Sequence, residues 1–234
     1  MGTFERHFAN YIRDFRNSAK VVARSPTGKG VHQLRVLSRR LRAVLWMAKF
    51  YDGADILPRL KTNLRSLGKN LGHGRQLDVL MKDASLYVLS DVDLKKQRKA
   101  WSREFKAFLT PDLCGEITRD LRELYKGVKA STSVEREVVL RKIYKPICKW
   151  PKKMPKDKGF LHQVRIEAKK VIYRLELLET EASSLKELQK SLGRVHDLEE
   201  LQKIFTSREA AQDMKVMKKK GRKIYDRARN EFNA

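Results

Sequence analysis

Hydrophobic residues recur three and four positions apart along nearly the whole chain, which is the period of helices with one buried face. Alternation of the strand type nowhere extends beyond four or five residues, so the pattern predicts an all-α protein. Clusters of Pro, Gly and helix-capping residues divide the pattern into about ten helices. We expect the breaks at residues 25–28, 52–53, 72–74, 90–91, 110–112 and 151–159.

The strongest interruption is a proline-rich segment at residues 146–159. Pro146, Pro151 and Pro155 stand there among lysines, a composition typical of a linker. We therefore predict an N-terminal helical half at residues 1–150 and a C-terminal half at 151–234, which together form one domain.

The two halves share a sequence repeat. The segment VHQLRV at residues 31–36 recurs as LHQVRI at 161–166. The first copy continues with Arg39-Arg40 and the second with Lys169-Lys170. Both copies have one basic and one apolar helix face, which indicates a duplicated helical unit.

A second pair of segments extends the repeat. Residues 65–72 and 186–193 both carry two basic residues four positions apart and end in Leu-Gly, and Asp78 then falls opposite Glu199. Each half therefore contains a similar helical hairpin, and we expect a pseudo-two-fold axis to relate the two hairpins.

A helical wheel through the first repeat places the basic residues on one side of the helix and the apolar residues on the other. The basic side is His32, Arg35, Arg39, Arg42 and Lys49. The opposite side is Leu34, Leu37, Leu41, Val44, Leu45 and Ala48. The second repeat places His162, Arg165 and Lys169 in front of Val164, Val171, Leu175 and Leu178. Like charges at helical spacing repel each other, so these stripes cost stability unless anions are present.

The overall charge points to the same kind of partner. The chain of 234 residues holds 53 Lys and Arg against 28 Asp and Glu, a net charge of +25. A face that is merely solvated usually mixes Glu with Lys, yet residues 29–49 contain no acid at all. Because the stripe is also duplicated, we favour an anion-binding surface over a solvated face.

Other features limit the class of protein. The longest apolar run, residues 43–48, is too short to span a membrane. Residues 1–16 carry three arginines and lack the apolar run of a secretion signal. Cys114 and Cys148 lie far apart and form no metal or disulfide motif. We therefore predict a cytoplasmic protein.

The repeated motif His-x-x-Arg-hydrophobic-x-x-basic-basic, each time followed by a helix ending in Leu-Gly, resembles the conserved histidine α-helical domain (CHAD) family. The matching segments are 32–49, 67–80, 162–178 and 188–201. The resemblance implies two antiparallel four-helix bundles related by a pseudo-two-fold axis around a basic channel. It also implies binding of inorganic polyphosphate, with an association with polyphosphate or storage granules.

Placed on this chain, the resemblance and the stripes together imply a polyphosphate-binding set. Its members are His32, Arg35, Arg39, Arg40, Arg42, Lys49, Lys61, Arg65, Lys69, Arg75, His162, Arg165, Lys169, Lys170, Tyr173, Lys186 and Lys190. Two positions depart from the family pattern. Ile172 stands where a further Arg is usual, and Arg75-Gln76 replaces the usual Arg-Asp. We expect the second repeat to bind polyphosphate less strongly at Ile172, because this position lacks the positive charge.

Polyphosphate has charge but no bases, so Lys and Arg side chains would supply its affinity by releasing counterions. Protonation of His32 and His162 would add charge beside a bound phosphate. We therefore expect binding to tighten as the pH falls through the sixes. A purely structural role for both histidines, hydrogen-bonded within the bundle, is the alternative.

The remaining signals are weak. His196-Asp197 lacks the further ligands of a metal site, and His73 stands between two glycines in a predicted turn. No phosphate-cradling glycine loop or activated nucleophile is visible, so we predict no enzyme, no cofactor and no metal.

Nucleic acid, RNA above all, is the alternative partner, because any cationic groove attracts phosphates. Residues 92–145 and the basic segment 215–229 fit either a binding surface or a solvated exterior.

Overall fold

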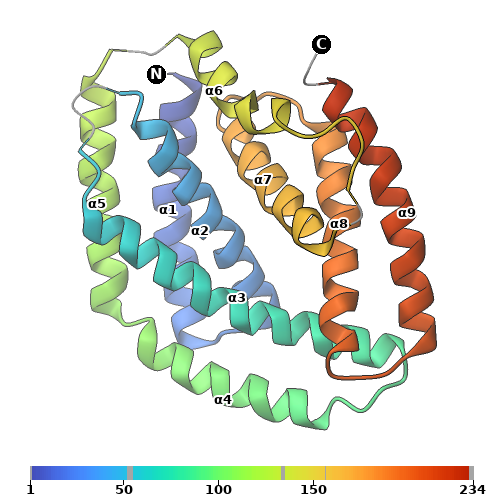
Figure 1. Cartoon of the computed structure of the whole chain (residues 1–234). Coiled ribbons are helices and arrows are strands. Elements are labelled where there is room, and N and C mark those ends of the chain that lie inside the picture. The colour runs from blue at the N-terminus through green and yellow to red at the C-terminus, as the bar shows by residue number, and fades with distance from the viewer. Residues whose placement is uncertain (1, 52–54, 133–134, 156, 232–234) are drawn as a thin grey trace. The chain divides into compact units, whose positions relative to one another are not determined.

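The structure, a computed structural model, describes residues 2–51, 55–132, 135–155 and 157–231 (Figure 1). Over these residues it consists of α-helices without strands, which confirms the predicted fold class. The helices are α1 (Thr3–Arg24), α2 (Gly28–Ala48), α3 (Pro58–Leu86), α4 (Val92–Phe108), α5 (Pro111–Ala130), α6 (Arg136–Cys148), α7 (Lys158–Glu176), α8 (Ser183–Gln202) and α9 (Arg208–Glu231). No described helix has the length and apolar character needed to cross a membrane.

Four of the predicted breaks separate helices. Thr27, Thr110 and Asp157 are N-caps whose side-chain oxygens accept hydrogen bonds from the backbone N–H three residues ahead. These bonds satisfy N–H groups that the first helical turn leaves without partners. The break at 90–91 also separates two helices, α3 and α4. The break predicted at 52–53 lies outside the described residues.

The chain divides into two compact units. Unit 1 comprises residues 1–81 and 91–134, and unit 2 comprises 82–90 and 135–234. This boundary differs from the predicted one at 150/151, because α6 packs against α7 and so belongs to the second unit.

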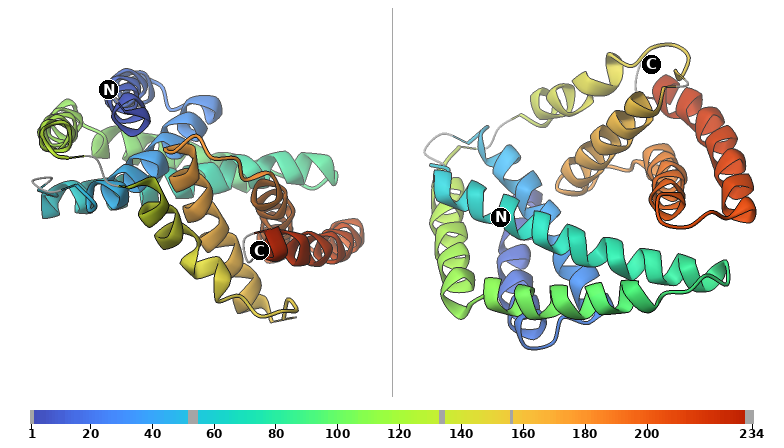
Figure 2. Two further views of the ribbon diagram at one scale, coloured as in Figure 1. Left: turned by 90° about the horizontal axis from the view of Figure 1, so that it is seen from above. Right: turned by 60° about the horizontal axis from the view of Figure 1, so that its bottom comes forward.

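In unit 1, α1 lies between α2 and α5 (Figures 1 and 2). Its apolar face carries Phe8 and Phe15, both fully buried, and the Phe8 ring meets Tyr125 of α5 edge-on, with centroids 5.4 Å apart. The predicted apolar side of α2 faces this core, since Leu34 and Leu41 are fully buried. Burial of these side chains holds the three helices together.

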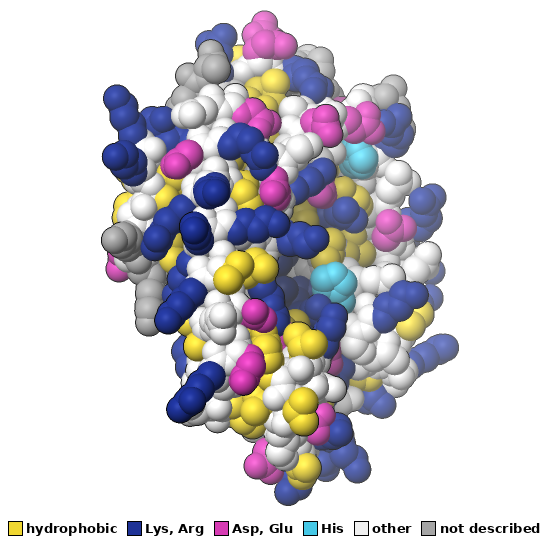
Figure 3. Space-filling model, turned by 90° about the vertical axis from the view of Figure 1, so that its right-hand side faces the viewer, with side chains coloured by type: hydrophobic (Ala, Val, Ile, Leu, Met, Phe, Trp, Pro, Cys, Tyr) yellow, Lys and Arg dark blue, Asp and Glu magenta, His cyan; other side chains and the backbone are white. Residues whose placement is uncertain are grey.

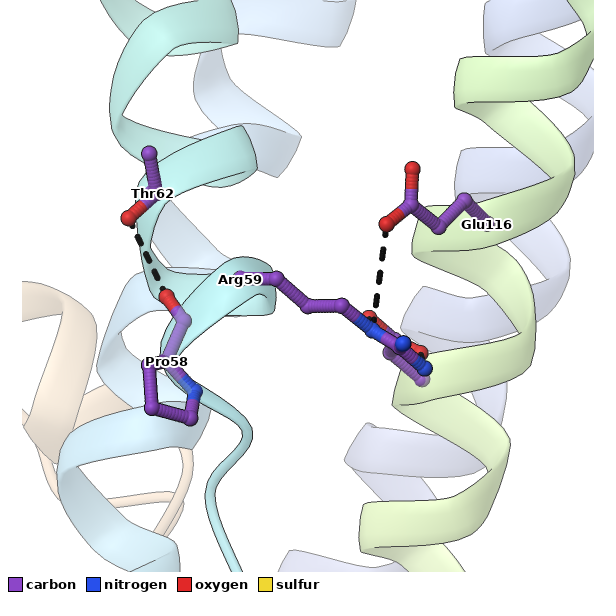
Figure 4. Close-up of polar contacts among 5 residues, drawn as sticks. Pro58, Arg59, Thr62 and Glu116 are labelled. Carbon is purple, nitrogen blue, oxygen red and sulfur yellow. Dashed lines mark hydrogen bonds and ion pairs between the residues drawn. The ribbon is translucent and has the colours of Figure 1, made fainter.

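An ion pair joins α3 to α5. Arg59 at the start of α3 donates two hydrogen bonds to Asp120, at 2.9 and 2.7 Å, and lies 3.7 Å from Glu116 (Figure 4). The Asp120 carboxylate is almost fully buried, so the arginine supplies the charge that its burial requires.

The turn predicted at residues 72–74 is wrong, because α3 runs through it without interruption. The glycines serve helix packing instead. A Cβ atom at Gly74 would lie 2.4 Å from the Trp101 ring, so the missing side chain makes room for the indole of α4. Trp101 Nε1 also donates a hydrogen bond to the Asn70 carbonyl oxygen, 3.1 Å away. Close helix packing therefore accounts for Gly74.

The duplication is visible as a repeated ion pair. In unit 1, Asp78 of α3 pairs with Arg98 of α4 at 2.7 Å. In unit 2, the matching Glu199 of α8 pairs with Lys218 of α9 at 2.9 Å. The helix pair α3 and α4 thus corresponds to α8 and α9, which extends the predicted repeat by one helix.

In unit 2 the segment predicted as a linker packs into the core. Trp150 stacks on Tyr225 of α9 with ring centroids 5.3 Å apart. Its Nε1 donates a hydrogen bond to Glu167 of α7 at 2.7 Å, and its carbonyl oxygen accepts one from Arg229 at 3.0 Å. Pro146 lies within the last turn of α6. These contacts anchor the segment to α7 and α9, which explains why the units do not part there.

Candidate anion-binding surfaces

The basic stripe of unit 1 follows α2. The helix begins at the Thr27 cap and carries no acidic residue, so nothing on it neutralises its arginines. His32 and Arg42 are exposed, and Arg35 and Arg39 are partly exposed. The stripe lies opposite the buried apolar side, as the helical wheel predicts.

Two glycines of α3 leave room for the arginines of this stripe to lie close to the α3 backbone. A Cβ atom at Gly72 would lie 3.8 Å from Nε of Arg35, and one at Gly68 would lie 3.9 Å from a terminal nitrogen of Arg42. Larger side chains at these positions would occupy the space of the guanidinium groups. The Leu-Gly of the repeat therefore allows cations of α2 to lie along α3.

The charges of the two helices act on one another. Partial burial and the charges of Arg75, Arg35 and Arg39 lower the pKa of His32. Partial burial, Arg39 and Arg65 likewise lower the pKa of Arg42, although much of this side chain is exposed. We call this set the first basic cluster: His32, Arg35, Arg39, Arg42, Arg65 and Arg75. Its members repel one another, and an anion would relieve that repulsion.

Unit 2 contains a second basic cluster: His162, Arg165, Lys169 and His196. The rings of His162 on α7 and His196 on α8 lie 5.6 Å apart. Burial and the charges of Arg165, His162 and Lys169 lower the pKa of His196 to about 4, against the opposing charge of Glu200. His196 is therefore neutral at physiological pH.

A carboxylate distinguishes the second cluster from the first. Burial raises the pKa of Asp197, a shift that Asp83 reinforces and that Arg165 opposes. Arg194, which also acts on Asp197, donates hydrogen bonds of 2.6 Å to both oxygens of Asp83. The position in unit 1 that matches Asp197 holds Gln76, so the first cluster lacks this negative charge.

Sequence reasoning missed the placement of His196 and Asp197, treating them as an isolated pair. The signal was present in the repeat. Aligning Leu71-Gly72 with Leu192-Gly193 puts His196 opposite Arg75 and Asp197 opposite Gln76. His196 and Asp197 therefore occupy, in the second repeat, the positions that Arg75 and Gln76 occupy in the first.

The other predicted residues lie outside the two clusters. The Arg40 guanidinium lies over the Tyr11 ring of α1, 5.6 Å from its centroid, and so contacts the helix behind the stripe. Tyr173 is partly exposed on α7, and the remaining positions are exposed lysines: Lys49, Lys61, Lys69, Lys170, Lys186 and Lys190. The electrostatic couplings that define the clusters do not include these residues.

The family departure at Ile172 is a core position. Ile172 is 5% exposed, so its side chain packs inside unit 2 and adds nothing to the basic surface. His73 also differs from expectation, because it is an exposed residue within α3 and not a turn residue. Across the described ranges, no three His, Cys, Asp or Glu side chains come close enough to hold a metal ion.

Lys and Arg side chains are spread over the face drawn in Figure 3, among fewer Asp and Glu side chains.

The family that the repeated motif resembles is also found when the chain is compared with known proteins. The family model of the CHAD domain matches residues 6–206. The crystal structure of the CHAD domain from the plant Ricinus communis superposes with a TM-score of 0.69 at 20% identity, covering 99% of this chain and 91% of that one. No curated protein matches the sequence significantly. The chain therefore belongs to the CHAD domain family.

Proposed function

We propose that this protein binds inorganic polyphosphate without chemical change, through the first and second basic clusters. The first basic cluster carries the proposal. Six basic side chains from α2 and α3 come together there: partial burial lowers the pKa values of His32 and Arg42, and the charges that lower them further are all arginines. Such a concentration of like charge is unfavourable by itself and favourable around a polyanion.

The cluster suits a linear anion. Arg35, Arg39 and Arg42 lie along one helix face over seven residues, a length of about 10 Å at ~1.5 Å per residue. Each guanidinium can donate to two phosphate oxygens at once. A chain with about one charge per phosphate would contact them in succession and release its counterions, which supplies the affinity.

The second basic cluster would contribute less. Asp197 brings a carboxyl group beside Arg165 and Lys169, and His196 is neutral at physiological pH. A carboxylate next to the arginine competes with phosphate for the same donors. We therefore assign the larger share of the affinity to unit 1. The prediction that both repeats line one channel stays a prediction.

Nucleic acid is the second candidate, since phosphates attract any cationic surface. Binding of single-stranded RNA usually adds bases stacked on aromatic side chains. Trp101 and Trp150 are each 4% exposed, and Trp46 packs edge-on against Phe50 with centroids 4.9 Å apart. All three tryptophans of the chain are thus engaged in packing. This favours a ligand recognised by charge alone.

Competition at near-physiological salt tests the proposal. Labelled long-chain polyphosphate bound to the protein is challenged with equal phosphate equivalents of unlabelled long-chain polyphosphate, short polyphosphate, heteropolymeric RNA and duplex DNA. We expect only long polyphosphate to compete well, and its chain length to be unchanged after incubation. Equal competition by RNA or DNA would identify a general polyanion binder, and shortened chains would identify an enzyme.

A cytoplasmic location with recruitment to polyphosphate or storage granules follows from the same proposal. The basic surfaces would hold the protein on a granule whose exposed chains carry negative charge. Imaging of a fluorescently tagged protein in cells with and without polyphosphate granules tests this step. Diffuse fluorescence in both would contradict it.

A further inference from the structure

Unit 1 contains a cavity of about 800 Å³ that the proposed function does not use. The cavity lies between α1 and α5, and its lining includes residues of both helices. None of the residues of the first basic cluster lines this cavity, which lies on the α5 side of unit 1's central helix α1 by its lining residues. It is therefore a separate site within the same unit.

Two rows of cations form the rim of the cavity. Arg16, Lys20 and Arg24 follow one another at four-residue spacing on α1, and Arg119, Arg122 and Lys126 do so at three- and four-residue spacing on α5. Glu123 is the one carboxylate of the lining, and it pairs with Lys126 at 3.2 Å. Within the part of the chain that the structure describes, the other five cations form no ion pair. The rim thus presents unneutralised positive charge from two sides.

The remaining lining residues carry no charge, and we call this uncharged part of the lining the floor of the cavity. It includes Ala23, Pro111 and Cys114, and burial raises the pKa of the Cys114 thiol, so that the thiol stays protonated. The Thr118 hydroxyl donates a hydrogen bond of 2.7 Å to the Cys114 carbonyl oxygen and is satisfied within its own helix. Gly115 is an exposed residue of this lining, and a Cβ atom there would meet nothing within 4 Å, so the position has room for a larger side chain.

We propose that this cavity binds a small molecule that joins an uncharged aromatic ring to several phosphates, the chemistry of a nucleoside polyphosphate. A bare phosphate chain would use the cationic rim and leave the uncharged floor empty. A neutral apolar molecule would fill the floor and leave the cations repelling one another. The cavity volume falls in the range of small-molecule sites, about 300–1,000 Å³.

Calorimetric titration of the full-length protein with ATP, tripolyphosphate and adenosine tests both halves of the recognition. We expect ATP to bind about tenfold more tightly than either comparator, since only ATP engages rim and floor together. Gly115→Leu should weaken ATP binding about tenfold by filling the floor, with little change for tripolyphosphate. Gly115→Ala is the matched control, because a methyl group leaves most of the cavity open, and it should bind ATP like the wild type.

Alkylation of the wild-type protein locates the site without any substitution. Cys114 lines the cavity, whereas Cys148 is exposed on α6 in unit 2. ATP should slow alkylation of Cys114 severalfold and leave Cys148 unchanged, as read by peptide mass spectrometry. Equal binding of ATP and tripolyphosphate, or unprotected Cys114 at saturating ATP, would overturn the proposal.

Discussion

Arg35 of α2 lies against Gly72 of α3, with its Nε 3.8 Å from the place where a Cβ atom would stand on that glycine. The contact sets an upper limit on the size of residue 72. A methyl group would make an ordinary van der Waals contact with Arg35, whereas a longer side chain would take the space of the guanidinium. Gly72 therefore positions a cation of the first basic cluster although it has no charge itself.

Gly72→Leu should weaken polyphosphate binding while leaving the net charge unchanged. The leucine displaces Arg35, and the loss of about one phosphate contact lowers the salt dependence of the affinity by about one unit of slope. Affinity measured over a series of salt concentrations reads both effects. Gly72→Ala is the control and should retain binding. A Gly72→Leu protein with wild-type affinity and slope would remove Arg35 from the site.

The neighbouring glycine should respond to alanine in the opposite way. At Gly74 the added methyl group would overlap the buried Trp101 ring, since the Cβ position is 2.4 Å from it. We expect Gly74→Ala to destabilise the protein by about 1–3 kcal/mol through overpacking. Gly72→Ala should instead stabilise it by about 0.5–1 kcal/mol, because alanine favours the helix more than glycine does. Chemical denaturation of the two variants gives the comparison, and equal stabilities would contradict the packing role of Gly74.

The sequence predicts much of this fold because periodicity reports buried faces. Leu34 and Leu41 are fully buried where the helical wheel places them, and both copies of the repeat begin helices, α2 and α7. The first basic cluster follows from the same wheel together with the basic positions of α3. Local spacing is sufficient for such features, since they depend on one helix face at a time.

The features that the sequence does not reveal depend on contacts between helices or on unusual turn residues. Gly74 has the composition of a turn, and only the Trp101 ring of a later helix shows why it is helical. The break between α7 and α8 contains no Gly or Pro that would mark it in the sequence. Glu179 there adopts the left-handed backbone conformation, with φ of 50°, which glycine adopts more often than other residues do. Arg40 lies on the α2 sequence motif, but its partner is Tyr11 of α1.

Binding should depend on the protonation of His32. Partial burial, Arg75, Arg35 and Arg39 lower the pKa of this histidine in the free protein, and a bound phosphate chain would raise it again. Binding then takes up a proton, so affinity should increase as the pH falls from 8 through the pKa of the bound form and level off below that of the free form. Affinities at fixed salt and several pH values measure this. His32→Gln should reduce the pH dependence, and an unchanged profile in that variant would exclude His32.

Acid should destabilise the folded state through His196. Its pKa is about 4 in the folded protein against 6.5 for an ordinary histidine, because of burial and the charges of Arg165, His162 and Lys169. The unfolded chain therefore binds the proton more readily, and stability is lost as the pH falls from 6.5 towards 4, by at most about 3 kcal/mol.

Denaturation of wild type and His196→Gln between pH 7 and pH 4 measures this loss. The substitution should flatten the stability profile over that range, because glutamine does not titrate. The neighbouring Asp197, whose raised pKa acts in the opposite direction, is present in both proteins and does not account for a difference between them. Parallel profiles would show that His196 is not the acid-sensitive group.

The central claim is that the first basic cluster, and not the net charge, binds polyphosphate. The most direct measurement compares two double variants that each remove two positive charges. Arg35→Ala with Arg39→Ala removes two arginines of the cluster, whereas Lys95→Ala with Lys96→Ala removes exposed lysines of α4 that pair with Asp91 and Asp93. We predict that the arginine variant loses most of its affinity for long-chain polyphosphate and about two units of salt slope, one for each lost phosphate contact. The lysine variant should bind nearly as the wild type does, and equal losses in the two variants would contradict the claim.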